Sequence, residues 1–127
     1  MDINLPDVLV EMEAAFARYE AALTSNDVAV LDSLFWDSAQ VIRYGIGENL
    51  YGAGEIAAFR AARPSVGLMR RLSRTVITTF GQDFATASTQ FHRDGAPGKI
   101  GRQMQSWVRM PEGWRVVAAH VSLIAEP

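Results

Sequence analysis

Residues 104–122 constrain the fold more than any other part of the sequence, because they predict a β-hairpin. A first strand ends near Arg109, a Pro-Glu-Gly turn follows at residues 111–113, and the return strand begins at Trp114. The return strand is apolar on both faces around residues 116–119, which is typical of a strand inside a sheet that is covered on both sides. After helices and longer strands, such a closing strand indicates a small curved sheet folded around a cavity.

The composition is that of one soluble globular domain, which we expect to span residues 1–127. Apolar residues make up 49% and charged residues 20%, enough to build a core. The absence of cysteine excludes disulfides and thiolate chemistry. No apolar run approaches the ~18 residues of a membrane span, and the acidic start lacks the basic region of a signal peptide. We therefore expect a cytoplasmic protein without a membrane partner.

Charge is distributed unevenly between the two halves of the chain, although the net charge is only −2. Residues 1–59 hold ten acidic groups against Arg18 and Arg43, whereas residues 60–127 hold ten basic groups against four acidic ones. All but one of the basic residues are arginine, which binds carboxylates through two parallel hydrogen bonds. The halves could simply form salt bridges with each other, or they could create a positive field for a small anion. The pI of about 5.6 and the lack of a recognition motif argue against nucleic acid.

Hydrophobic spacing predicts helices first and long strands afterwards. Asn4 and Pro6 mark the start of a helix whose apolar stripe continues to Leu23, and Asp27 caps a short second helix. The other expected elements are short strands at 41–44 and 49–51, a helix at 55–63, and long strands at about 68–80, 84–93, 99–109 and 114–124. This order predicts an α+β fold in which three N-terminal helices pack on a curved, mainly antiparallel sheet.

The final hairpin, GWRVVAAHVS with Trp107 before it, resembles the SnoaL-like, nuclear-transport-factor-2-like superfamily, whose cystatin-like fold is a cone of curved sheet and three helices. Within that superfamily the chain resembles the AtzH-like proteins, which include oxalurate-catabolism accessory proteins and the dicarboxyurea decarboxylase of cyanuric acid breakdown. The segments that carry the resemblance are INLPDVLVEMEAAFARYEAALTSNDVAVLDSLFW, RYGIGENLYG, IAAFRAARPSVGLMRR, TVITTFGQDFATASTQF and GRQMQSWVR.

Tyr19 and Arg43 are the candidate catalytic residues. Tyr19 lies on the apolar stripe of the first helix, so its ring should face the sheet, and its buried hydroxyl needs a partner. It is either a core tyrosine bonded to backbone or a proton donor at the end of the cavity. Arg43 shares a strand face with Val41, so it points inward if Val41 does. A buried guanidinium then needs a carboxylate from the protein or from a ligand, and we expect the ligand to supply it; otherwise Arg43 lies at a strand edge in solvent.

The candidate substrate-binding residues are Gln103, Gln105, Trp107 and Asn49. The first three alternate along one strand face, where paired amides beside an indole suit a planar, urea-like ligand, because each amide offers a donor and an acceptor. We expect this face to line the cavity, although it could instead be the outer, dimer-forming face. Asn49 lies near the turn that closes the cavity mouth, where asparagine is also common for local reasons.

Other candidate groups are less informative. We expect most arginines between 60 and 74 to be solvated or salt-bridged, with Arg60 or Arg63 best placed to reach the cavity mouth. His92 and His120 lack the spacing of metal ligands, and Gly45-x-Gly47 is no dinucleotide fingerprint. We therefore expect no metal and no cofactor.

The resemblance implies a cofactor-free decarboxylase that acts on a small anionic N-carboxylated ureido compound of the dicarboxyurea or carboxybiuret type. Arg43 would hold a carboxylate, Tyr19 would supply a proton, and the amides would bind the ureido core. The alternative is a non-catalytic binding protein or accessory subunit of a pathway amidase, because this fold also hosts binding functions; a pure oligomerisation module is less favoured. We also expect a homodimer through the open face of the long-stranded sheet.

Overall fold

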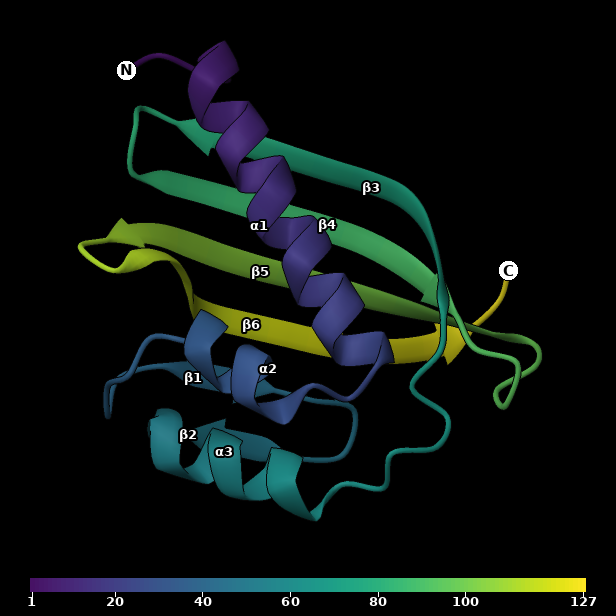
Figure 1. Cartoon of the computed structure of the whole chain (residues 1–127). Coiled ribbons are helices and arrows are strands. Elements are labelled where there is room, and N and C mark those ends of the chain that lie inside the picture. Colours follow the sequence, from purple (N-terminus) through teal and green to yellow (C-terminus); the bar gives the residue numbers. More distant parts are fainter.

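Three helices lie on one face of a six-stranded sheet in the computed structural model, which describes all residues from 1 to 127 (Figure 1). The expected α+β architecture is confirmed. The helices are α1 (Pro6–Thr24), α2 (Val28–Leu34) and α3 (Gly52–Ala62). The strands are β1 (Ile42–Tyr44), β2 (Asn49–Tyr51), β3 (Arg71–Phe80), β4 (Phe84–His92), β5 (Lys99–Met110) and β6 (Gly113–Ala125).

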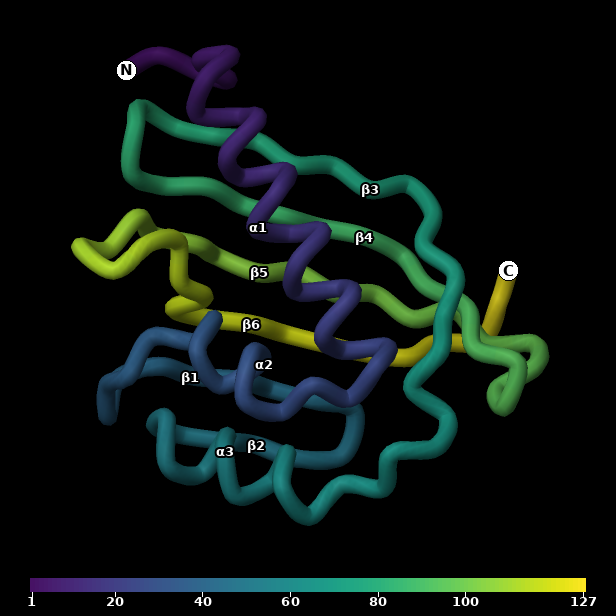
Figure 2. Tube along the Cα trace, in the orientation of Figure 1, coloured from purple at the N-terminus to yellow at the C-terminus, as the bar shows by residue number.

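The strands follow the order β2-β1-β6-β5-β4-β3, and every neighbouring pair is antiparallel except β1 and β6. The return strand β6 therefore lies inside the sheet, between β5 and β1, as its two apolar faces predicted. The trace in Figure 2 shows α1 crossing the long strands while α2 and α3 lie over the short ones. None of the three helices is long and apolar enough to cross a membrane.

The apolar stripe of α1 packs against the sheet as its spacing predicts, and Val8, Met12, Phe16 and Tyr19 are all buried. The start of the helix differs from the prediction. Asn4 does not cap it, because Asn4 has a positive φ of 57° and its side chain accepts a hydrogen bond from the backbone of β3 instead. This hydrogen bond connects the segment before α1 to the edge strand β3.

The other two helices begin at residues with clear local causes. Asp27 caps α2 by accepting a hydrogen bond from the backbone N–H of Val30, as predicted. Helix α3 begins at Gly52, three residues before the predicted start at Glu55. Gly52 has a φ of +86°, which glycine adopts without strain, so the chain turns directly from β2 into the helix.

The strand register decides which side chains face the helices. Arg43 pairs with Leu50 on β2 and with Ala119 on β6, and Ala119 in turn pairs with Gln105 on β5. Because residues directly opposite one another share a sheet face, these four side chains form one row. Leu50 and Ala119 belong to the hydrophobic core, so the row faces inward.

Candidate functional site

Buried polar side chains on β5 form the floor of the candidate site. Gln103 and Gln105 are 2% and 3% exposed, and Trp107 is fully buried. The prediction that these three residues share the inner face is confirmed, because the next residue on the opposite face, Met104, is exposed. Trp107 Nε1 donates a hydrogen bond to Gln105 Oε1 at 3.0 Å. Arg70 Nη2 donates one to Gln103 Oε1, also at 3.0 Å.

These two hydrogen bonds fix how the amides are oriented. An indole N–H and a guanidinium can only donate, so each must face an amide oxygen. The Nε2 groups of Gln103 and Gln105 are consequently left buried without any acceptor from the protein. The expectation that each amide offers both a donor and an acceptor is therefore corrected: both offer only N–H donors, which suit carbonyl or carboxylate oxygens.

Tyr19 lies next to this floor. Its side chain is 4% exposed, and its ring packs edge-on against Trp107 with 6.2 Å between the ring centroids. A second aromatic contact, to Phe35, has the same centroid distance. The Tyr19 hydroxyl forms no hydrogen bond with the protein, so the alternative of a core tyrosine bonded to backbone does not apply. The ring is held in place while the hydroxyl remains available.

Arg43 faces inward, but its partner differs from the expectation. Its Nη1 forms an ion pair with Glu48 Oε1 at 2.9 Å, so a protein carboxylate does lie beside it. Glu48 folds back over the β1–β2 turn, and Gly45 makes this possible, because a Cβ there would come within 1.7 Å of the Glu48 carboxylate. The pair is not sealed off: Arg43 and Glu48 keep 12% and 23% side-chain exposure and both line a cavity.

The cavity has a volume of about 170 Å³ and is rich in arginine. Its lining residues come from the β1–β2 turn, the end of α3, the segment after α3, the β4–β5 loop and β6: Arg43, Ile46, Glu48, Phe59, Arg63, Leu68, Arg93 and Val121. Val121 pairs with Gln103 across β5 and β6, so the cavity adjoins Gln103. Gln103, Gln105 and Tyr19 lie in the interior behind it and are not among its lining residues. Glu48 is the only carboxylate in the lining.

Arg63 and Arg93 lie in this cavity without a carboxylate partner. Arg63 Nε and Nη2 and Arg93 Nε are buried and have no acceptor from the protein. Burial lowers the pKa of Arg63, and the nearby charges of Arg60 and Arg43 lower it further. Burial likewise lowers the pKa of Arg93, with Arg70 and Arg43 adding to the effect. The negative charge of Glu20 acts on the pKa of Arg93 in the opposite sense and raises it.

An aromatic ring positions Arg93. The guanidinium carbons of Arg93 and Arg70 lie over the Phe91 ring, 5.0 and 4.6 Å from its centroid. The ring itself rests on Gly101, where a Cβ would come within 2.1 Å of it. Gly101 therefore allows Phe91 to lie flat enough to support both arginines.

We expected most arginines between residues 60 and 74 to be solvated or salt-bridged, and Arg60 and Arg70 form salt bridges. Arg70, with 1% side-chain exposure, binds Glu20 on α1 through two hydrogen bonds of 2.9 and 2.6 Å. Arg60 binds Asp32 on α2 at 2.6 Å. Of the two arginines expected near the cavity mouth, only Arg63 lines the cavity.

Asn49 does not take part in the site, which corrects its predicted place. It pairs with Tyr44, one residue beyond Arg43, so it lies on the opposite, outer face of the sheet, where it is exposed. The turn that we expected to bring it to the cavity mouth instead brings Glu48 there.

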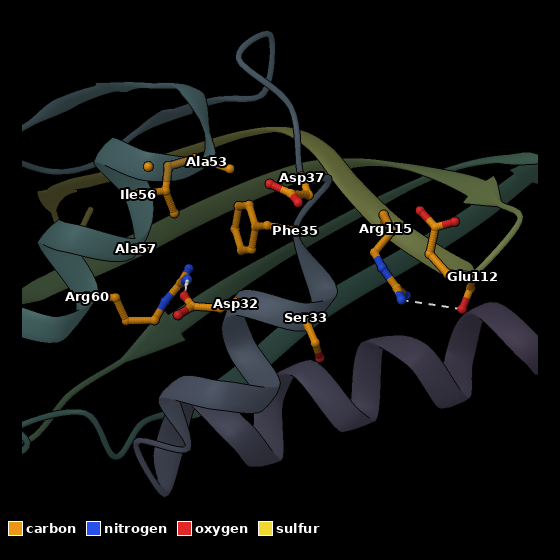
Figure 3. Close-up of a pocket in the computed structure, with 11 residues that line it drawn as sticks. Asp32, Ser33, Phe35, Asp37, Ala53, Ile56, Ala57, Arg60, Glu112 and Arg115 are labelled. Carbon is orange, nitrogen blue, oxygen red and sulfur yellow. Dashed lines mark hydrogen bonds and ion pairs between the residues drawn. The ribbon is translucent and has the colours of Figure 1, made fainter.

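A larger groove of about 630 Å³ lies at the other end of the sheet, between α2, the start of α3 and the β5–β6 turn (Figure 3). Both of its arginines are paired within the protein. Arg60 pairs with Asp32, and Arg115 donates to the backbone carbonyls of Trp114 and Glu112. The groove therefore lacks the unpaired donors found in the arginine cavity. Neither region brings together three His, Asp or Glu side chains that could hold a metal ion.

Sequence reasoning missed two charged residues of the cavity, Glu48 and Arg93. Both lie in connections between strands, where the direction of a side chain depends on the loop rather than on strand alternation. Two glycines in GIGEN were a usable signal for Glu48, since they mark a tight turn that could return a side chain. Nothing in the local sequence distinguishes Arg93 from a solvated loop arginine.

The model of the AtzH-like family matches residues 1–127. The chain belongs to the AtzH-like family. Among curated proteins the chain has no match.

Two solved structures resemble this AtzH-like protein over nearly its whole length. A protein of unknown function from the DUF3225 family of Pectobacterium atrosepticum is 66% identical, with a TM-score of 0.95 over 98% of this chain and 96% of its own. A cystatin-like fold protein from Burkholderia xenovorans is 50% identical, with a TM-score of 0.95 over 100% and 99% of the two chains. A nuclear-transport-factor-2-like protein from Salmonella enterica, 24% identical with a TM-score of 0.75 over 94% and 93% of the chains, shares the fold. Family and fold together indicate a small-molecule-binding or accessory role.

Proposed function

We propose that this protein is a cofactor-free decarboxylase of small N-carboxylated urea compounds of the dicarboxyurea or carboxybiuret type. The proposal rests on three features on the inner side of the sheet: a Tyr19 hydroxyl without a hydrogen bond to the protein, two buried amide N–H donors, and an arginine-lined cavity. Within this arrangement, the groups without a protein partner are donors of protons or hydrogen bonds. Such a set suits a ligand that is rich in carboxylate and carbonyl oxygens.

The chemistry requires a proton but no electron sink beyond the substrate. The bond between the carboxylate carbon and the urea nitrogen breaks, the carboxylate leaves as CO2, and the electron pair stays on nitrogen in conjugation with the urea carbonyl. The N–H groups of Gln103 and Gln105 would stabilise the charge that develops on that carbonyl oxygen. Tyr19 would deliver the proton to nitrogen and regain one from solvent.

Arg43 would bind a carboxylate and orient the planar substrate. Its ion pair with Glu48 uses only Nη1, so the remaining N–H groups of the guanidinium stay free for a ligand. Phe59, whose ring centroid lies 5.6 Å from the Arg43 guanidinium carbon, would limit its movement.

The test is CO2 release from dicarboxyurea and carboxybiuret by the purified protein and by two variants, Tyr19→Phe and Arg43→Ala. Turnover by the wild type and its loss in both variants are expected, with far-UV and near-UV circular dichroism unchanged. Arg18→Gln is the matched control, because Arg18 is exposed on the same helix and forms no salt bridge. Near-normal CO2 release from both site variants would refute the mechanism.

An accessory role without catalysis is the alternative, in which the same cavity binds a ureido acid and the protein assists a pathway amidase. Wild-type protein that binds dicarboxyurea without accelerating CO2 release would favour it. A pull-down with the amidase, repeated with and without the ureido acid, would then identify the partner.

A further inference from the structure

The arginine cavity carries an unbalanced positive charge. Arg43, Arg63 and Arg93 contribute three guanidinium groups, which stay protonated in proteins, and Glu48 contributes the only carboxylate. Because Glu48 is already paired with Arg43, two positive charges in the lining remain unpaired. One is on Arg63 and the other is on Arg93.

Elsewhere in this chain, buried arginines are matched by carboxylates. Arg70 binds Glu20 and Arg60 binds Asp32, at 2.6 Å in each case. Arg63 and Arg93 are only partly buried as residues, but Nε and Nη2 of Arg63 and Nε of Arg93 are buried and no protein atom accepts a hydrogen bond from them. A buried donor without a partner is unfavourable, and two like charges in one cavity add to the penalty. Such a pair is expected where an anionic ligand supplies the missing acceptors.

We propose that Arg63 and Arg93 bind a second carboxylate of the ligand, so that the cavity selects small dianions over monoanions of the same size. This inference rests on the proposed function for the identity of the substrate, and it names the substrate class: a compound with a carboxylate at each end. One carboxylate lies at Arg43, and the other lies between Arg63 and Arg93.

The size of the cavity agrees with this class. At about 170 Å³ it is smaller than the roughly 300–1,000 Å³ of pockets for drug-sized ligands. Dicarboxyurea and carboxybiuret have the same length and differ in one terminal group, which is a carboxylate in the first and an amide in the second. Size therefore does not separate these two compounds, whereas the unpaired guanidinium groups of Arg63 and Arg93 favour the one with a second carboxylate. Within the proposed reaction, dicarboxyurea is therefore the preferred substrate.

The experiment compares two stable ligands by isothermal titration calorimetry. Glutarate has two carboxylates separated by three carbons, the same number of atoms as in dicarboxyurea, but it has no N-carboxylate to lose. Glutaramate has the same size with one carboxylate replaced by an amide. Each is titrated into the wild type, Arg63→Gln, Arg93→Gln and the control Arg18→Gln, which removes the same charge from an exposed site.

We expect the wild type and Arg18→Gln to bind glutarate at least about tenfold more tightly than glutaramate, as a bidentate charged contact would provide. Arg63→Gln and Arg93→Gln should lose most of that preference. Equal affinities in the wild type, or no binding of either ligand, would overturn the inference without any need for the variants. A preference that survives in both variants would overturn it as well.

The failure of this inference and the failure of the proposed function are distinguishable. Selective glutarate binding without decarboxylation of dicarboxyurea would retain the dianion site and reject the enzyme. Decarboxylation with an unchanged KM in Arg63→Gln and Arg93→Gln would retain the enzyme and reject the second carboxylate site.

Discussion

Trp107 Nε1 donates a 3.0 Å hydrogen bond to Oε1 of Gln105, two residues earlier on the same face of β5. Because the indole nitrogen can only donate, this contact engages the amide oxygen of Gln105 and leaves its buried amide N–H groups without an acceptor from the protein. Trp107 is fully buried and packs edge-on against Tyr19. A single indole therefore holds both the proposed proton donor and one proposed carbonyl-binding group.

Gln105→Leu separates this binding role from stability. The variant should lower kcat about a hundredfold, the usual loss when one donor to a developing oxyanion is removed. Its free energy of unfolding should change by less than about 1 kcal/mol, because a newly unpaired Trp107 N–H replaces an amide N–H that was already unpaired. Urea unfolding and CO2 release measure the two effects. Gln90→Leu, on the outer face of β4, is the control, and equal activity of the two variants would contradict the prediction.

Tyr19→Phe should affect turnover alone. The substitution keeps the ring contacts with Trp107 and Phe35 and removes only a hydroxyl that has no partner in the protein. Loss of a proton donor lowers turnover by about 10²–10⁴-fold, whereas the unfolding free energy should shift by no more than about 0.5 kcal/mol. Steady-state kinetics and urea unfolding provide the comparison. A large loss of stability would show that the hydroxyl has a structural partner instead.

The fold followed closely from the sequence because its elements are long and strongly patterned. Strand alternation placed Gln103 and Trp107 on one face, and the apolar stripe of α1 placed Tyr19 against the sheet. Strand alternation also placed Arg43 on the inner face, but it gave no information on Glu48, which reaches Arg43 through a two-glycine turn. Local sequence pattern predicts which face of the sheet a side chain occupies. The partner of that side chain depends on the conformation of a loop, which the pattern does not specify.

For the arginines, too, the sequence did not determine which side chain finds a carboxylate partner. The charge asymmetry between the two halves left two alternatives open, namely salt bridges across the fold or a positive field for an anion. Arg70 pairs with Glu20 from the acidic half, whereas Arg93 finds no carboxylate. Whether an arginine forms a salt bridge or remains without a carboxylate partner depends on contacts between segments far apart in the chain, such as that of Phe91 with Gly101. Composition carries no information on those contacts.

The Glu20–Arg70 pair should be a major stabilising contact between α1 and the sheet. Glu20→Gln leaves the buried Arg70 guanidinium without its charged partner and should lower the free energy of unfolding by about 3 kcal/mol. The double variant Glu20→Gln with Arg70→Met removes the uncompensated charge and should recover part of that loss. Urea unfolding of the two single variants and the double variant forms a thermodynamic cycle. Additive effects would show that the two residues are not coupled.

The outer face of the sheet should form a homodimer interface. Val76, Phe84 and Met104 lie on this face, and they are 58%, 37% and 63% exposed, while all three helices cover the opposite face (Figure 1). Met104→Glu places a charge in the middle of the face and should convert a dimer into a monomer at micromolar concentration. Multi-angle light scattering measures the mass. Val10→Glu, an equally exposed position on α1, should leave the mass unchanged, and a monomeric wild type would refute the prediction.

Arg63→Met should stabilise the ligand-free protein while it weakens ligand binding. In the wild type, Arg63 holds two buried nitrogens without acceptors and lies near the like charges of Arg60 and Arg43. Replacing the guanidinium with an apolar side chain removes that penalty, so the free energy of unfolding should rise by about 1 kcal/mol. Saturating glutarate should reverse the order of the two free energies of unfolding, because it stabilises the wild type through binding to the folded state and has a weaker effect on the variant.

Thermal unfolding with and without glutarate measures both changes, with Arg18→Met as the control for the loss of one positive charge. If Arg63→Met were less stable than the wild type in the absence of any ligand, Arg63 would be a structural residue and the cavity would not be held ready for an anion.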